Sequence, residues 1–297
     1  MVHANARMER RFIIALGISL LVFLAELFGG WWTGSLALLS DSAHVFLDVF
    51  ALAISYVALR AAALPADDRH TYGWHRLEVF AALANGITLL AITVAIFFEA
   101  WRRLQNPAPI HSAAMLVIAT IGLVASLATA RVLKEHHADD LNAHSAFLHV
   151  VGDALASLGV IVGGVAMLLT GWYALDPIIS AFIGAIIVVS SWRVLRGSLH
   201  ILFEGTPEGI AIGDVAQAMG NVKGVQDVHD LHLWSICSGY PALSAHVLVT
   251  DAASNVTTAQ MAVLKQTLAD RFNIRHTTIQ FETTNCGQGT VVCQNDS

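Results

Sequence analysis

Residues 145–172 read Ser145-Ala-Phe-Leu-His-Val-Val-Gly-Asp-Ala-Leu-Ala-Ser-Leu-Gly-Val-Ile-Val-Gly-Gly-Val-Ala-Met-Leu-Leu-Thr-Gly-Trp172, with one acidic residue and neither lysine nor arginine. A helix of this length rises about 42 Å, enough to cross the roughly 30 Å hydrocarbon core of a bilayer. His149 and Asp153 lie four positions apart, and therefore on one helical face. Because ionisable groups are costly inside a membrane, the pair predicts a functional site within the span.

Six apolar segments of this kind predict a membrane-embedded, all-α six-helix bundle. They cover residues 12–33, 36–63, 77–101, 113–133, 145–172 and 177–195. The 297-residue chain is 56% hydrophobic and 13% charged, with a mean hydropathy of +0.63. An ordinary soluble domain has about a quarter of its residues charged, so that class is excluded. The net charge of -6 argues against nucleic acid as a partner.

The basic residues set the orientation of the predicted spans. If both termini lie in the cytosol, the cytosolic ends of the spans carry Arg7, Arg10, Arg11, Arg60, Arg69, Arg76, Arg131, Lys134, Arg193 and Arg196, and the opposite side carries Arg102 and Arg103. This excess follows the positive-inside rule. We expect a multi-pass protein of a bacterial inner membrane with cytoplasmic termini, although an organelle membrane fits the same pattern.

Residues after about 200 predict a small cytosolic α+β domain. Thr206-Pro207-Glu208 has the N-cap residue, first-turn proline and first-turn acid of a helix that would end near Gly220. Residues 226–236 and 242–250 alternate like strands around a turn, and 256–272 and 276–283 predict a helix and a third strand. We therefore expect a membrane domain at 1–203, an αββαβ domain at 204–283 and a flexible tail at 284–297.

A second intramembrane pair, His44 and Asp48, lies in the second predicted span. Two imidazoles and two carboxylates form a complete tetrahedral ligand set, and imidazole favours zinc-like ions over magnesium or calcium. Because bound ligands must be deprotonated, metal and protons would compete for the four residues. A structural hydrogen bond between helices explains one such pair equally well. The repetition of the pair in two spans favours a transport site at His44, Asp48, His149 and Asp153.

Several motifs together carry a resemblance to a known family. They are Ala25-Glu-Leu-Phe-Gly-Gly30, Ser40-Asp-Ser-Ala-His-Val-Phe-Leu-Asp48, Arg69-His-Thr-Tyr-Gly-Trp-His-Arg-Leu-Glu78, His149-Val-Val-Gly-Asp153 and His229-Asp-Leu-His-Leu-Trp234. Over nearly the whole chain they resemble the cation diffusion facilitator family of metal/proton antiporters. The resemblance implies a homodimer with a ferredoxin-like cytosolic domain, no enzymatic activity and no cofactor. The His-Asp quartet is similar to the zinc-preferring branch, with Zn²⁺ as substrate and regulatory ligand and Cd²⁺ or Co²⁺ as further cations.

The resemblance also implies a metal site in the cytosolic domain. His229, His246 and Glu282 match family ligands on three strands. His276 is a candidate fourth ligand, because it lies six residues before Glu282 and hence on the same face of its strand. His229 and His232 lie three residues apart and are expected to face oppositely, which favours a structural role for His232.

Two weaker candidate sites follow from the same resemblance. Asp67, His70 and His75 resemble the family's loop zinc site, with Trp74 where a second histidine is expected, and a solvated loop explains them equally well. In the tail, a cysteine pair resembles that of some relatives at wider spacing; it consists of Cys286 and Cys293. A polar loop between the fourth and fifth spans resembles a short His-rich loop, and its members are His136, His137, Asp139, Asp140 and His144.

Other polar residues have candidate structural or functional roles, and Glu26 and Asp41 have two interpretations each. Glu26 and Asn85 are expected to make polar contacts between helices, with a proton relay at Glu26 as the alternative. Asp41 either guides cations or stabilises the start of its helix through the helix dipole. Arg76 and Glu204 match a charge interlock between the membrane and cytosolic domains of the family.

Two other classes of function stay open from the sequence. In a metal sensor, the bundle would only anchor the cytosolic domain, and no metal would cross the membrane. A membrane metalloenzyme is disfavoured because the quartet leaves no open coordination position for a substrate.

The quartet generates a prediction about selectivity. His44→Asp should lower the ratio of zinc flux to cadmium flux, because it exchanges a borderline nitrogen ligand for an oxygen and changes the charge and reach of the side chain. Flux of both metals into proteoliposomes measures the ratio. A variant with the parent's ratio would show that His44 does not set selectivity.

Overall fold

The computed structural model describes residues 2–62, 64–134, 141–250, 254–284 and 291. Within its helices, the side chains of residues 2–15, 47, 48, 51, 52, 55, 56, 58, 59, 62, 129–134, 141–151, 153 and 254–257 lie outside the description. The chain forms two compact units. One comprises Met1–Tyr56 and Ala84–Leu195, and the other comprises Val57–Leu83 and Arg196–Ser297.

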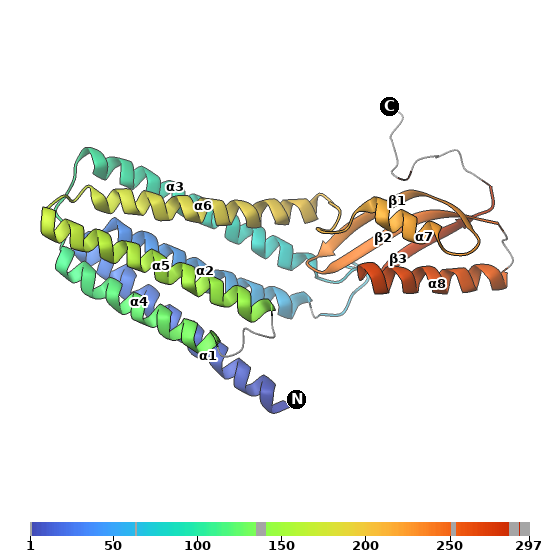
Figure 1. The fold of residues 1–297 in the computed structure, drawn as a ribbon, viewed down its shortest axis with the longest axis horizontal. Helices are drawn as coiled ribbons and strands as arrows, with labels where there is room; N and C mark the ends of the chain where they lie inside the picture. The colour runs from blue at the N-terminus through green and yellow to red at the C-terminus, as the bar shows by residue number, and fades with distance from the viewer. Residues whose placement is uncertain (1, 63, 135–140, 251–253, 285–290, 292–297) are drawn as a thin grey trace. The chain divides into compact units, whose positions relative to one another are not determined.

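Long helices build the first unit (Figure 1). They are α1 (Val2–Thr33), α2 (Leu36–Ala62), α3 (Arg76–Gln105), α4 (Ser112–Lys134), α5 (Leu141–Thr170) and α6 (Leu175–Leu202). Among the described residues, the segments long and apolar enough to cross a membrane are Leu16–Thr33, Arg76–Gln105 and Leu175–Leu202. The described parts of α2, α4 and α5 contribute shorter apolar segments.

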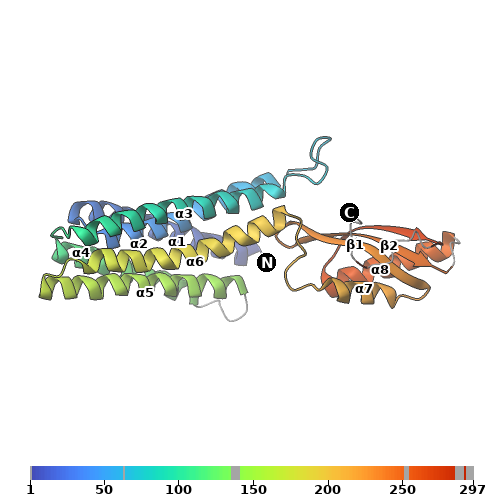
Figure 2. The same ribbon diagram turned by 90° about the horizontal axis from the view of Figure 1, so that it is seen from above.

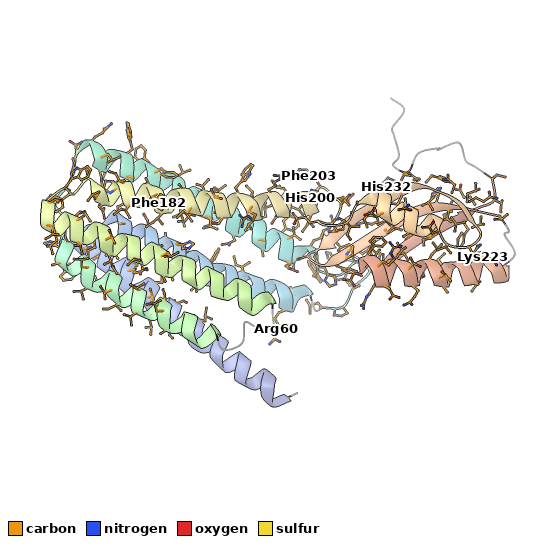
Figure 3. All side chains as sticks on the ribbon, viewed as in Figure 1. Arg60, Phe182, His200, Phe203, Lys223 and His232 are labelled. Atoms are coloured by element: carbon orange, nitrogen blue, oxygen red, sulfur yellow. The ribbon has the colours of Figure 1, made fainter. Side chains whose placement is uncertain are left out.

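Small residues allow these helices to approach closely, as is common in membrane bundles. A Cβ atom at Gly163 of α5 would collide with Ile179 of α6, and one at Gly184 of α6 would crowd Phe97 of α3. The outer faces stay apolar: Phe182 on α6 is 68% exposed (Figure 3). Apolar side chains therefore occur on both the inner and the outer faces of the bundle, as a lipid environment requires.

Asp176 holds the start of α2 from the first turn of α6. Its side chain is fully buried. The hydroxyl of Ser35 donates to Oδ1 at 2.6 Å, and the backbone N–H groups of Leu36 and Ala37 donate to the carboxylate at 2.7 and 3.1 Å. Nη1 of Arg103 on α3 lies 3.9 Å from Oδ2. One carboxylate thus joins α2, α3 and α6.

The second unit confirms the predicted element order αββαβ. It contains α7 (Ile212–Gly220), β1 (Val225–Cys237), β2 (Tyr240–Val249), α8 (Ser254–Phe272) and β3 (His276–Glu282). The sheet order is β1-β2-β3, with β1 and β2 antiparallel and β2 and β3 parallel. Both helices cover one face of the sheet (Figure 2). The core between them includes Val215, Met219, Leu231, Leu243, Val247, Leu264 and Leu268.

The predicted start of α7 was wrong by five residues. The helix begins at Ile212, and its N-cap residue, Ala211, makes no side-chain capping bond. Gly209 has a φ of +81°, which is incompatible with an α-helix, and the N–H of Ile210 bonds to the carbonyl of Pro207 at 3.2 Å. The residues that resemble a helix start therefore form a turn before it.

A bulge in β1 corrects the predicted facing of its histidines. His229 pairs with His246 and His232 pairs with Ser244, so β1 advances three residues while β2 advances two. The extra residue restores the alternation, and His229 and His232 share one face of the sheet. Asp230, inside the bulge, has a φ of +47°. A count of residues from the sequence alone cannot detect such an insertion.

The segment 57–83 groups with residues 196–297 in the second unit. The ring of Tyr72 lies 5.3 Å from that of His276, and the ring of His75 lies 5.2 Å from that of Tyr240. Nη2 of Arg76 lies 3.3 Å from Oε1 of Glu204, which makes the ion pair that the family resemblance predicted. Both partners are exposed, so the pair contributes about 0.2–1 kcal/mol.

Most of the predicted tail lies outside the described residues. Residue 291 is described, and the carbonyl of Val291 accepts a hydrogen bond of 2.9 Å from the N–H of Leu231. The flexibility of the tail stays a prediction.

The contacts of Asp176 predict its contribution to stability. Asp176→Ala should lower the free energy of unfolding by on the order of 3 kcal/mol. The reason is that the substitution leaves the buried donors at the start of α2, and the Arg103 charge, without their shared carboxylate. Thermal unfolding in detergent should give a clearly lower midpoint. Glu99→Gln, which changes the charge of a partly exposed partner of Arg102 and Arg103, is the matched control and should shift the midpoint much less. Equal midpoints for Asp176→Ala and the parent would contradict the assigned role.

Candidate metal centres

The predicted transport ligands lie on two helices of the first unit. His44 and Asp48 belong to α2, and His149 and Asp153 belong to α5. His44 is half-buried, and the other three side chains lie outside the described residues. The coordination geometry of the quartet therefore stays a prediction.

A described contact connects the two helices beside these residues. The hydroxyl of Ser157 on α5 donates to Oδ2 of Asp41 on α2 at 3.2 Å. Asp41 is 2% exposed and Ser157 is 3% exposed. Asp41 thus binds a neighbouring helix, a role that neither interpretation from the sequence included. The sequence analysis missed Ser157, although it lies four residues after Asp153 and hence on the same helical face.

The two candidates for polar contacts between helices, Glu26 and Asn85, are also buried in this unit. Glu26 on α1 is 1% exposed, and its carboxylate lies against Gly122 on α4. Asn85 on α3 is 9% exposed. The position of Glu26 between α1 and α4 agrees with the predicted contact between helices, and its role as a proton relay stays a prediction.

The loop before α3 brings together two of its three predicted ligands. Oδ1 of Asp67 accepts hydrogen bonds from the N–H groups of Arg69 and His70, and Nδ1 of His70 lies 3.1 Å from the same oxygen. These bonds, that of Arg69 foremost, hold the pKa of Asp67 below its usual value. The ring of His70 stacks on Trp74 at 3.8 Å. His75 instead contacts Tyr240, so the three predicted ligands do not form one site.

The sheet brings three of the predicted cytosolic ligands together. His229, His246 and Glu282 come from β1, β2 and β3, and one ligand atom from each lies within 4.8 Å of the others. Nε2 of His229 lies 3.2 Å from Oε2 of Glu282, and Nδ1 of His246 lies 2.8 Å from Oε1. His229 is 1% exposed and Glu282 is 11% exposed. Alternation places all three on the sheet face opposite α7 and α8.

The donor set fits a zinc-like ion. Ligands of tetrahedral zinc at bond lengths near 2.1 Å are separated by about 3.3 Å, close to the two separations in the cluster. Two imidazoles and a carboxylate leave the fourth position for water or another ligand. Because residues from all three strands converge, the site can form only in the folded domain.

His276 was wrongly predicted as a fourth ligand of this cluster. It shares a strand face with Glu282, but it pairs with Ala242, whereas Glu282 pairs with Leu248. Six residues of strand separate the two side chains by about 20 Å. His276 instead lies beside Tyr72 and Tyr240 and lines a cavity together with His75.

Other candidate ligands cannot be placed. Cys286, Cys293, His136, His137, Asp139 and Asp140 lie outside the described residues, as does the side chain of His144. Cys237 is buried at the end of β1, and burial, assisted by the charge of Glu78, raises the pKa of its thiol. The thiol is therefore protonated at neutral pH and is a poor metal ligand.

Two acids that the sequence analysis did not single out flank the cytosolic cluster. They are Asp227 and Asp230, on either side of His229 in the stretch Asp227-Val-His-Asp230. The presence of two acids within two residues of a predicted ligand is the signal that could have identified them.

Comparison with known proteins gives the family. Residues 12–203 match the cation efflux transmembrane domain, and residues 207–284 match the cation efflux protein cytoplasmic domain. The chain belongs to the cation diffusion facilitator family. Members of this family are transporters and not enzymes, so the metalloenzyme alternative is excluded.

Curated members of the cation diffusion facilitator family match over most of the chain. The metal cation efflux system protein CzcD of Cupriavidus metallidurans is 40% identical over 94% of this chain and 88% of its own length. A cadmium, cobalt and zinc/H(+)-K(+) antiporter of Bacillus subtilis is 36% identical, over 88% and 84%. The zinc transporter ZitB of Escherichia coli is 35% identical, over 93% and 88%.

A solved structure also matches the C-terminal part of the chain. It is the metal-bound C-terminal domain of the CzcD transporter from C. metallidurans, which is 41% identical and covers 25% of this chain and 99% of its own, with a TM-score of 0.23.

The cytosolic cluster predicts a metal stoichiometry. The double variant His246→Ala/Glu282→Ala of the full-length protein should bind one zinc ion fewer per protomer than the parent, because it removes two of three ligands. Equilibrium dialysis followed by metal analysis gives the number. His276→Ala should leave it unchanged, and a loss of zinc in that control would restore His276 as a ligand.

Proposed function

We propose that the chain exports Zn²⁺ from the cytosol in exchange for protons. Transport takes place at an intramembrane site formed by His44, Asp48, His149 and Asp153. The protein acts as a homodimer with six membrane crossings per protomer in a bacterial inner membrane, and both termini lie in the cytosol. The cytosolic domain is ferredoxin-like and binds regulatory zinc.

The hydrogen bond between Asp41 and Ser157 is the observation that carries this proposal. α2 and α5 run antiparallel (Figure 1), and this buried contact sets their relative height. At a rise of 1.5 Å per residue along the helix axis, position 44 on α2 lies about 4.5 Å from the level of this contact. Because α5 runs the opposite way, position 153 lies about 6 Å from the contact in the same direction. Position 48 on α2 and position 149 on α5 lie about 10.5 and 12 Å from the contact, in the same direction along the helix axes. The helix rise therefore supports one level at which His44 faces Asp153 and a second level at which Asp48 faces His149.

The chemistry of the four residues supports an exchange of metal for protons. Two carboxylates cancel the charge of one divalent cation, so the loaded site is close to neutral in a low-dielectric setting. When the site is empty, repulsion between the two carboxylates favours bound protons. Each proton that enters down a one-unit pH gradient contributes about 1.4 kcal/mol. Metal from the cytosol and protons from outside would therefore displace each other without nucleotide hydrolysis.

The relatives support the choice of cation and of mechanism. One relative is named a zinc transporter, and another is named an antiporter of cadmium, cobalt and zinc against H(+) and K(+). Because the proposed site has two histidine and two aspartate ligands, we propose zinc as the main substrate and cadmium or cobalt as further substrates. The dimerisation domain matched at 207–284 supports the homodimer.

The transport site predicts the effect of removing one carboxylate. Asp48→Ala and Asp153→Ala should each reduce zinc flux at least roughly 70-fold, since an uncompensated charge in the bilayer costs at least about 2.5 kcal/mol. Uptake into proteoliposomes with an imposed pH gradient and a trapped zinc indicator measures the flux.

Asp68→Ala, at an exposed loop position, is the matched control and should retain the parent's flux. Near-parental flux in either quartet variant would refute the site. If the parent itself binds zinc but moves none across the membrane, the protein is a sensor and the proposal as a whole fails.

A further inference from the structure

Each histidine of the cytosolic cluster lies between two carboxylates. His229 has Nε2 at 3.2 Å from Glu282 and Nδ1 at 3.3 Å from Oδ2 of Asp227. His246 has Nδ1 at 2.8 Å from Glu282 and Nε2 at 3.7 Å from Oδ2 of Asp230. One nitrogen of each ring thus faces the shared central carboxylate, and the other faces an outer acid.

The backbone explains how Asp230 reaches this position. It occupies the bulge of β1 with a φ of +47°, a conformation in which glycine is the least strained residue. Its side chain is 21% exposed, and Oδ1 lies 3.1 Å from Nε2 of His232, which is on β1 (Figure 3). The carboxylate therefore lies between His232 and His246, on the same sheet face as the cluster.

We propose that Asp227 and Asp230 are positioning residues for the cytosolic metal ion. This inference rests on the proposed zinc site at His229, His246 and Glu282. With the ion bound, Asp227 would accept the N–H of Nδ1 of His229 and Asp230 would accept the N–H of Nε2 of His246, so the two acids would select opposite tautomers in the two rings. The lone pairs of Nε2 of His229 and Nδ1 of His246 would then point toward the ion that they share with Glu282.

This arrangement has two consequences for the ion. Ligating histidines normally donate their second N–H to a carboxylate or carbonyl, which fixes the ring and makes the ligating nitrogen more basic. The outer acids also add negative charge beside a site with one ligating carboxylate, which favours a divalent cation. The distance of 3.7 Å at Asp230 is longer than a hydrogen bond, and we expect it to shorten when the ion binds.

The alternative is that Asp230 serves only the backbone of the bulge. The two roles differ in their response to Asp230→Gly. Glycine adopts a positive φ without strain, so a backbone role predicts an unchanged or more stable domain with unchanged metal affinity. A positioning role predicts weaker metal binding without loss of stability.

The test uses Co²⁺ as the probe and the full-length protein in detergent. The background carries Asp48→Ala and Asp153→Ala, so that the intramembrane quartet does not contribute. Visible absorption of tetrahedral Co²⁺ reports the cytosolic site and gives its affinity, and His246→Ala should abolish the signal. Thermal unfolding without metal reports stability separately.

Asp227→Asn, Asp230→Asn and Asp230→Gly should each weaken Co²⁺ binding about 10–100-fold, the usual effect of removing such a partner. Their metal-free unfolding midpoints should match or exceed that of the background protein. Asp270→Asn, the same charge change at an exposed position on α8, should change neither quantity.

Parental Co²⁺ affinity in both Asp230 variants and in Asp227→Asn would overturn the positioning role while leaving the zinc site intact. Absence of the Co²⁺ signal from the background protein itself would instead overturn the cytosolic site, and the present inference with it.

Discussion

A carboxylate that leaves water must find hydrogen-bond donors or a cation, and this requirement organises both units of the chain. Asp176 receives three donors from the start of α2. Asp41 receives the hydroxyl of Ser157 from α5. Glu282 lies between two imidazoles from neighbouring strands. Since each acid binds elements distant in sequence, satisfying its charge also fixes the relative positions of those elements.

In the membrane unit, the acids fix the helix that carries half of the proposed transport site. Asp176 holds the first residues of α2, and Asp41 joins the same helix to α5 slightly further along. Both attachments lie at the end of α2 that precedes His44. Because these contacts are buried and hydrogen-bonded, this end should be the more rigid part of α2. Rearrangements that open the site to one side or the other are then expected to pivot about it.

In the cytosolic unit, the carboxylates gather around a candidate metal site instead of joining helices. Three carboxylates and two imidazoles come together on the sheet face opposite α7 and α8, where a cation would relieve the repulsion between the acids. A ligand that binds only the folded arrangement stabilises it in proportion to the logarithm of its excess over the dissociation constant. The cytosolic concentration of metal could thus favour one arrangement of the cytosolic domains without contacting the membrane quartet.

The long helices and the αββαβ order were predictable because they depend on local patterns. Apolar length determines a span, as in residues 145–172, and alternation of side chains determines a strand. The spacing of His44 and Asp48 indicated a shared helical face, and the orientation that the charged loops predict stays a prediction. The resemblance to the cation diffusion facilitator family implied His229, His246 and Glu282 as metal ligands.

The remaining features depended on contacts between distant residues. The sequence could not show that a bulge at Asp230 returns His232 to the face of His229, because one inserted residue reverses the count. The error at His276 has a different cause, because six residues of strand rise already separate it from Glu282 by about 20 Å. The sequence also could not assign Ser157 to Asp41 or Ser35 to Asp176. Spacing along the chain therefore determined which residues share a face, whereas the pairing of strands and helices decided which of them meet, because that pairing sets distance and register.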